Sequence, residues 1–236
     1  MAIKASDILK RANITLQDAG YVRWTLPELL WYLNDAMREL ALHKPNAVTK
    51  TVELALEKGT VQTLDDAYIS LVRVVRNLVT LSGSADGRTG GKAITVTKRG
   101  SLDSVMPEWQ NPAVLPYTVQ VEHFVQDMAD PRTFYVIPGN DGTGVVEAVV
   151  SILPVEVDAP AAPLDIASYD AIELDAPAIF RNALADYVVY RAYTKDSADP
   201  SQAQRATAHY NLFAQAIGLK TTSDQSTQLK TTPQTS

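Results

Sequence analysis

The chain has 236 residues, of which 46% are hydrophobic and 20% are charged, and these proportions are ordinary for a soluble globular protein. No apolar run is long enough to cross a membrane and the first residues lack a secretory signal, so we expect no membrane segment. The absence of cysteine excludes disulfides and thiolate metal sites. A formal charge of −6 argues against a protein that binds the phosphate backbone of nucleic acid. It does not argue against a surface along which DNA passes without binding.

The N-terminal region predicts two helices. The first spans residues 6–18, with Ser6 as its N-cap and Gly20 as its C-terminal stop. The second begins after Thr25, which is expected to form a capping box with Glu28, and it stops before Pro45. Its apolar residues recur at three- and four-residue spacing, which predicts one buried face: Leu26, Leu29, Leu30, Leu33, Met37, Leu40 and Ala41.

From Val48 the hydrophobic period changes to two, which predicts strands. Residues 48–64 are interpreted as a β-hairpin that turns at Lys58-Gly59, and residues 71–81 as a strand or a short helix followed by one. Further strands are expected over residues 93–97, 117–126, 133–137 and 145–153. Between them, residues 101–116 hold three prolines and Trp109, so we expect an irregular stretch pinned by a buried ring. The middle third therefore predicts a small antiparallel sheet.

Two more helices are predicted near the C-terminus. Asp175 is the expected N-cap of the first, which runs to about residue 196, and Asp199 caps the second, which ends at Gly218. The whole order predicts an α+β fold: a mainly helical bundle of two N-terminal and two C-terminal helices, an inserted antiparallel β domain and an extended C-terminal tail. The expected boundaries are 1–47 and 175–219 for the helical layer, 48–157 for the β domain, 158–174 for a linker and 220–236 for the tail.

The tail has Leu229 as its one large apolar side chain, so it cannot bury enough surface to order itself. A threonine-rich polar segment of this kind suits addition to the sheet edge of a partner, where its backbone supplies the hydrogen bonds. The tail residues expected to bind a partner are Thr221, Thr222, Thr227, Gln228, Leu229, Lys230, Thr231 and Pro233.

No pattern of residues predicts catalysis, a cofactor or a metal site. His43, His123 and His209 fall in unrelated elements without metal-ligand spacing, and the glycine-rich stretch 87–93 fails the P-loop pattern. One aromatic and basic cluster in the third helix could stack on bases, but basic residues are sparse around it. A seam between subunits is the favoured interpretation for this cluster, which consists of Tyr187, Tyr190, Arg191 and Tyr193.

Several motifs, in collinear order, resemble a family of head-to-tail adaptor proteins of short-tailed phages. The opening motif includes Arg23-Trp24-Thr25, Glu28-Leu29-Leu30 and Lys44-Pro45-Asn46-Ala47, and a later one runs from Asp130 to Pro138. The strongest is the segment from Asp186 to Asp196, followed by residues 205–213. The resemblance covers about residues 6–218 and leaves out the tail.

This resemblance implies a structural virion protein with no enzymatic activity and no cofactor. It implies a homododecameric ring, assembled in the host cytoplasm, that sits between the portal protein and a tail nozzle or tail tube protein, with possible contacts to tail fibres. Double-stranded DNA would pass through a central channel without sequence-specific binding, and no membrane would be involved. The C-terminal tail would extend to the portal protein and bind it.

The residues by themselves do not exclude two other functions. A virion-associated peptidoglycan hydrolase would need two Glu or Asp side chains facing each other across a cleft. A helix-turn-helix DNA-binding protein built on residues 175–218 is disfavoured by the acidic composition.

Overall fold

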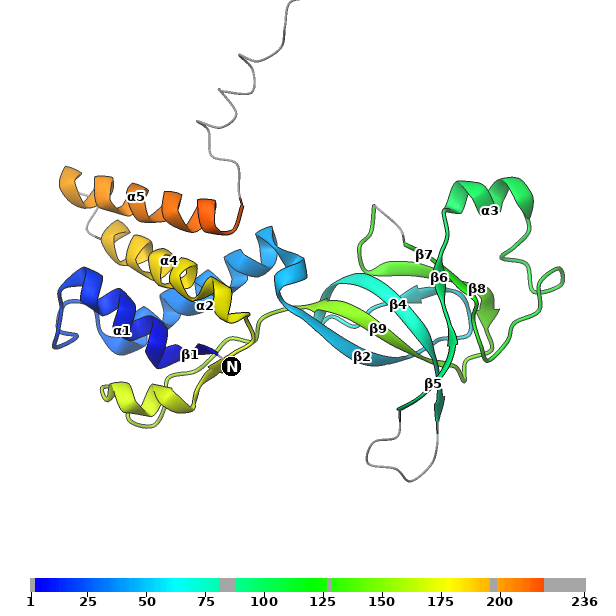
Figure 1. Cartoon of the computed structure of the whole chain (residues 1–236), viewed down its shortest axis with the longest axis horizontal. Coiled ribbons are helices and arrows are strands. Elements are labelled where there is room, and N and C mark those ends of the chain that lie inside the picture. The colour runs from blue at the N-terminus through cyan, green and yellow to red at the C-terminus, as the bar shows by residue number, and fades with distance from the viewer. Residues whose placement is uncertain (1–2, 81–87, 127–128, 196–198, 219–236) are drawn as a thin grey trace, which may run out of the picture. The chain divides into compact units, whose positions relative to one another are not determined.

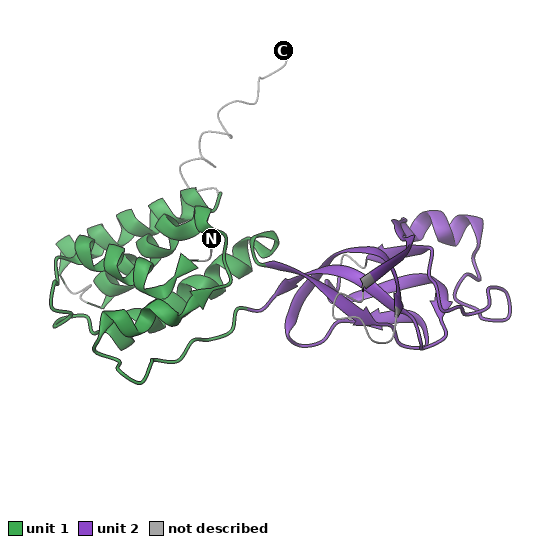
Figure 2. Cartoon of the chain, turned by 60° about the horizontal axis from the view of Figure 1, so that its bottom comes forward, with its two compact units in different colours: residues 1–48, 154–236 green, residues 49–153 purple. Residues whose placement is uncertain are grey.

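The computed structural model describes residues 3–80, 88–126, 129–195 and 199–218, and it confirms the α+β class. The chain divides into two compact units, coloured separately in Figure 2. Unit 1 combines Met1–Val48 with Pro154–Ser236, and unit 2 is the continuous stretch Thr49–Leu153. Unit 2 therefore interrupts the sequence of unit 1 once.

Unit 1 is mainly helical. Its α-helices are α1 (Ala5–Leu16), α2 (Leu26–His43), α4 (Arg181–Thr194) and α5 (Pro200–Ala216), and its 3-10 turns are η1 (Pro45–Ala47), η2 (Ile166–Ala171) and η3 (Ala178–Phe180). A two-residue antiparallel pair joins β1 (Ile3–Lys4) to β10 (Glu173–Leu174). Two residues are too few to show a hydrophobic period, so this pair is not visible in the sequence. Helix α4 packs against α1, α2 and α5, so it is the central element of the unit.

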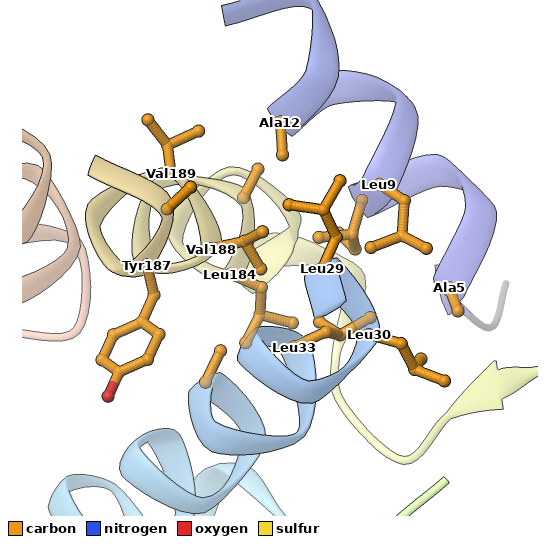
Figure 3. Close-up of a cluster of buried hydrophobic side chains, with 14 of the residues drawn as sticks. Ala5, Leu9, Ala12, Leu29, Leu30, Leu33, Leu184, Tyr187, Val188 and Val189 are labelled. Atoms are coloured by element: carbon orange, nitrogen blue, oxygen red, sulfur yellow. The ribbon is translucent and has the colours of Figure 1, made fainter. Parts of the chain in front are cut away.

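The core of unit 1 forms where α1, α2 and α4 meet (Figure 3). Leu29 and Leu33 from α2 lie against Leu184 and Val188 from α4, and none of these four side chains is accessible to solvent. The apolar face predicted for α2 is buried along its whole length. Burying one such side chain contributes about 1.5–3 kcal/mol, so this layer is the main source of stability for the unit.

Helix α1 differs from its prediction at both ends. Ser6 is not the N-cap; it lies buried in the first turn, and its hydroxyl donates to the carboxylate of Asp170 in η2. The N-cap is Lys4. The helix ends at Gln17, which adopts the left-handed conformation with φ 57°, and Gly20 plays no part in stopping it.

Asp18 organises the loop between α1 and α2. Its two carboxylate oxygens accept hydrogen bonds from three consecutive backbone N–H groups, those of Val22 (3.1 Å), Arg23 (2.9 Å) and Trp24 (3.0 Å). Partial burial disfavours the charged form, but the hydrogen bonds outweigh it and lower the pKa of Asp18. The loop therefore depends on an ionised carboxylate.

Helix α2 starts where predicted, with Thr25 as N-cap, but the capping box does not form. The Thr25 side chain makes no capping hydrogen bond. The carboxylate of Glu28 has other partners: it accepts a hydrogen bond from the Tyr32 hydroxyl (2.8 Å) and forms an ion pair with the ammonium of Lys195 (2.8 Å). A tertiary ion pair thus replaces the expected local contact, and it links the start of α2 to the end of α4.

Of the two N-caps predicted for the C-terminal helices, the structure contains one. The Asp199 carboxylate caps α5 by accepting from the N–H of Ser201 at 2.9 Å, and Gly218 follows the helix with a positive φ of 75°, both as expected. At the start of α4, however, the turn η3 intervenes, and the N-cap is Phe180 instead of Asp175.

Unit 2 contains two four-stranded sheets within its described residues (Figure 1). The first has the order β2 (Thr49–Ala55), β9 (Val145–Ile152), β4 (Tyr68–Thr80), β5 (Arg88–Ala93). The second has the order β3 (Gly59–Thr63), β8 (Thr133–Asn140), β7 (His123–Gln126), β6 (Thr95–Val96). The unit also carries helix α3 (Arg99–Val105).

The single antiparallel sheet predicted from sequence is therefore wrong. Strands β2 and β3 pair with β9 and β8 in different sheets, so residues 48–64 do not form a hairpin. Strands β6 and β7 are parallel. Alternation identifies the two faces of a strand but not its partner, which explains these errors. Part of the stretch expected to be irregular is the helix α3, whereas Trp109 is buried as expected, with 2% of its surface exposed.

Two buried amides explain why residues 117–122 are not the strand that alternation predicts. Asn77 donates to the carbonyl of Val121 (2.8 Å) and accepts from the N–H of Val121 (2.9 Å). Asn140 donates to the carbonyls of Thr118 (3.0 Å) and Val119 (2.9 Å). Side chains thus supply much of the hydrogen bonding that a neighbouring strand would have given this segment.

Candidate functional site

The cluster predicted to face a neighbouring subunit lies on α4, but two of its rings are buried within their own unit. Tyr187 and Tyr193 are only 4% and 5% exposed. The ring of Tyr187 packs against Phe213 at 4.9 Å between centroids, and that of Tyr193 packs edge-on against Trp24 at 6.1 Å. Burial raises the pKa of Tyr187. Both side chains therefore stabilise the helical core of a single chain.

The other two members of the cluster, Tyr190 and Arg191, are half-buried and reach the surface. The guanidinium of Arg191 pairs with Asp35 on α2 at 2.9 Å and lies over the ring of Tyr32 at 5.5 Å. Tyr190 packs against Tyr210 of α5 at 5.1 Å. A role for the cluster at a contact between subunits stays a prediction. Of its four members, Tyr190 and Arg191 are the two that a neighbouring subunit could reach.

Asp35 connects this pair to a second exposed region. Its carboxylate also lies 3.5 Å from Arg38 one turn further along α2, and Arg38 pairs at 2.5 Å with Glu156 from the segment that returns from unit 2. Each such exposed ion pair contributes only about 0–1 kcal/mol to the stability of the fold. The main effect of the series is therefore to place alternating charges across this face of α2.

Exposed apolar side chains accompany these charges. Trp31 and Leu42 are 63% and 69% exposed, and their separation of eleven residues, close to three helical turns, places them on the same face of α2 as Arg38. Val155, 81% exposed, precedes the Glu156 that pairs with Arg38. We call this region the α2 patch; it consists of Trp31, Arg38, Leu42, Val155 and Glu156.

A groove of about 390 Å³ opens between α1 and α4. Its floor is formed by the buried side chains of Ala185 and Val189, and its rim carries Ile14, which is 78% exposed, together with the charged Arg11 and Asp186. We call it the α1–α4 groove. It is completed by Thr15 and Asn182.

Unit 2 has a groove of its own, of about 490 Å³, beside the edge strand β6. Val96, Val125 and Tyr135 make it largely apolar. The guanidinium of Arg99 lies over the Tyr135 ring at 5.0 Å and donates to its hydroxyl at 3.3 Å. Among the described residues β6 is the last strand of its sheet, and the edge of a sheet is the kind of surface that accepts extended peptides.

The histidines each have a local partner: Nε2 of His43 lies 3.1 Å from Glu39, and Nδ1 of His209 lies 2.9 Å from Asp186. Nδ1 of His123 shares a hydrogen bond with the hydroxyl of Thr95 at 2.6 Å. Across the described residues, no three His, Asp or Glu side chains are grouped so that they could hold a metal ion. None of the helices in this part of the chain is long and apolar enough to span a membrane.

A family model, that of the SU10 adaptor protein, matches residues 3–235, which is nearly the whole chain. The chain belongs to the SU10 adaptor family. This is a family of phage head-to-tail adaptors, so the resemblance seen in the sequence motifs is confirmed and the protein is a structural phage adaptor. A search of curated proteins found no match.

The family match corrects one expectation about the extent of the resemblance. The resemblance was expected to end near residue 218, but the match continues to residue 235 and so includes nearly all of the tail. The tail residues predicted to bind a partner, Thr221, Thr222, Thr227, Gln228, Leu229, Lys230, Thr231 and Pro233, lie outside the described residues. Their role stays a prediction.

Proposed function

We propose that this protein is one subunit of a ring, a homododecamer, that joins the portal protein to a tail nozzle or tail tube protein. The observation that carries the proposal is the family match over residues 3–235. The ring belongs to the virion at the head–tail junction, is assembled in the host cytoplasm, and encloses a channel through which double-stranded DNA passes. Tail fibres are further candidates for contact with unit 2.

A ring needs lateral contacts, and the helical unit has exposed groups suited to them. Tryptophan and arginine are the side chains that most often dominate protein interfaces. Trp31 and Arg38 lie exposed on α2, and Tyr190 and Arg191 reach the surface of α4. Asp35 contacts both Arg38 and Arg191, so these groups form one continuous face.

The tail supplies the contact with the portal. Its 17 residues from Lys220 to Ser236 carry many threonines and one large apolar side chain, Leu229. In an extended conformation they would reach roughly 55 Å, enough to cross to a neighbouring protein. Backbone pairing with the edge of a portal sheet would provide affinity, and Leu229 would fill a pocket there.

The net charge is consistent with a passage for DNA. Each subunit contributes a formal charge of −6, so a ring of identical subunits is acidic as a whole. Negative channel walls repel the phosphate backbone and let the duplex move without sticking.

The test is to mix the protein with portal rings and to image the product by electron microscopy. The full chain should add a layer to the portal, whereas a chain that ends at Leu219 should not bind, with an unchanged circular dichroism spectrum. A control with residues 220–236 in shuffled order keeps the length and charge of the tail and should also fail to bind. Portal binding by the truncated chain at full strength would refute the proposed role of the tail.

A further inference from the structure

We propose that the α2 patch of one copy docks into the α1–α4 groove of a second copy, with Trp31 entering the groove. The inference rests on the proposed function, because it names the lateral contact from which the ring would be built.

The two surfaces lie on opposite sides of α4. Leu184 and Val188 of α4 face α2, whereas Val189 forms part of the groove floor. Val189 is five residues from Leu184, which at 3.6 residues per turn places it about 140° around the helix. Figure 3 shows Val189 projecting from the side of α4 that faces away from α2. A single copy therefore presents the patch on one side and the groove on the other.

This placement selects a head-to-tail contact. A surface that paired with itself would make a closed dimer, whereas two different surfaces on opposite sides of a subunit repeat from copy to copy and can close into a ring. Each copy would use its patch toward one neighbour and its groove toward the other.

The shapes are complementary. A groove of about 390 Å³ exists because its floor consists of the short side chains Ala185 and Val189, 8% and 1% exposed. Trp31 is the largest exposed apolar side chain on the described surface of the unit, at 63%. A tryptophan that packs on an apolar floor within a polar rim loses little conformational entropy and buries a large area, which is the usual basis of an interface hot spot. Ile14 on the groove rim would close over the ring.

The charges around each surface also match. The patch carries Arg38 and Glu156, and the groove rim carries Arg11 and Asp186. Arg11 donates to the neutral side-chain amide of Asn182 at 3.2 Å, which leaves its charge available to a carboxylate such as Glu156 from the neighbour. Arg38 would exchange Glu156 for Asp186 of the neighbour, a carboxylate that already lies 2.9 Å from His209. Rim charges of this kind set the register of an interface more than its affinity.

Site-specific cross-linking tests the contact, since the chain has no natural cysteine. The double variant Leu42→Cys/Thr15→Cys carries one thiol within the patch and one within the groove, and both positions are exposed. With a bifunctional thiol reagent at high protein concentration it should give a ladder of covalent oligomers. A mixture of the two single variants should give dimers only. Absence of any ladder, or efficient dimers from Leu42→Cys alone, would overturn the head-to-tail contact.

Trp31 is tested in the same double-cysteine background. Trp31→Glu should reduce the ladder at least tenfold because it removes the ring and places a charge against the apolar floor of Ala185 and Val189. The matched control is Ile179→Glu, at an 82% exposed position of unit 1 outside both surfaces, and it should leave the ladder unchanged. Unaltered circular dichroism spectra would show that both variants fold. An undiminished ladder from Trp31→Glu would refute the role of this side chain.

Portal binding by the same proteins separates this inference from the proposed function. If the double-cysteine chain binds portal rings but no patch-to-groove cross-links form even there, the contact is wrong and the function stands. If cross-linked oligomers form but the chain never binds portals, the contact stands and the portal assignment fails.

Discussion

The side-chain amide of Asn34 in α2 makes two hydrogen bonds with the backbone of Val157. The amide nitrogen donates to the Val157 carbonyl at 3.0 Å, and the amide oxygen accepts from the Val157 N–H at 3.1 Å. Asn34 is 5% exposed, and Val157 lies four residues after the end of unit 2. One buried side chain therefore holds the returning segment against α2 as a neighbouring strand would, and it fixes the position of the adjoining α2 patch.

Replacing Asn34 by Ala should destabilise the helical unit by about 1–3 kcal/mol, because the donor and acceptor of Val157 lose their partners in a poorly hydrated place. Urea unfolding followed by circular dichroism measures the loss. Asn211→Ala, at an exposed position of α5, is the control and should change stability by less than about 0.5 kcal/mol. Equal stability of the two variants would show that the amide does not hold the segment.

Asp18→Asn should destabilise the protein in a pH-dependent way. The hydrogen bonds in the α1–α2 loop lower the pKa of Asp18 below its ordinary value of 3.8, so the carboxylate contributes stability that is fully present above that value. This contribution is lost as the pH falls through the lowered pKa of the folded state. The difference in unfolding free energy between wild type and Asp18→Asn should therefore be largest at neutral pH and shrink in acid. Asp158→Asn, the same change at an exposed site, should follow the wild type throughout.

The Asp35–Arg191 ion pair should contribute little to folding. Both side chains remain about one third exposed, and exposed pairs couple by roughly 0.2–1 kcal/mol in double-mutant cycles. A cycle of Asp35→Ala and Arg191→Ala, measured by urea unfolding, should fall in this range. The cycle of Asp35→Ala with Lys195→Ala, whose partner is Glu28, should give a smaller coupling. A coupling well above 1 kcal/mol would mean that the pair is a folding determinant and not a surface feature.

Unit 1 should fold without unit 2. Thr49 and Ser151 are paired in register on β2 and β9, so the chain enters and leaves unit 2 at neighbouring positions. Opposite residues of antiparallel strands lie about 4.5–5.5 Å apart, so Thr49 and Ser151 are close together and we expect a short Gly/Ser linker to join Val48 to Pro154. The resulting chain should keep its helical circular dichroism signal and unfold in one cooperative transition, and residues 49–153 alone should show a β spectrum. A molten helical fragment would show that the two units depend on each other.

The sequence by itself determined the features that arise within one element. The apolar stripe of α2, the cap of α5 at Asp199 and the glycine that follows it at Gly218 were read correctly, because side-chain periodicity and end signals depend on residues within a turn or two of one another. The motifs of the adaptor family were readable for the same reason, since each is a short contiguous string.

Only the tertiary structure decided which elements meet. In the folded protein Glu28 forms an ion pair with Lys195 instead of a capping box with Thr25. Tyr187 and Tyr193 lie inside the core, and β2 and β3 belong to two different sheets. The capping box is a local preference worth about 1 kcal/mol, and a contact with a residue far away in the sequence replaced it. Burial in the assembled fold placed the two rings, and strand alternation does not select a partner. The pairing of the α2 patch with the α1–α4 groove could be proposed only after folding brought residues from both ends of the chain around α4.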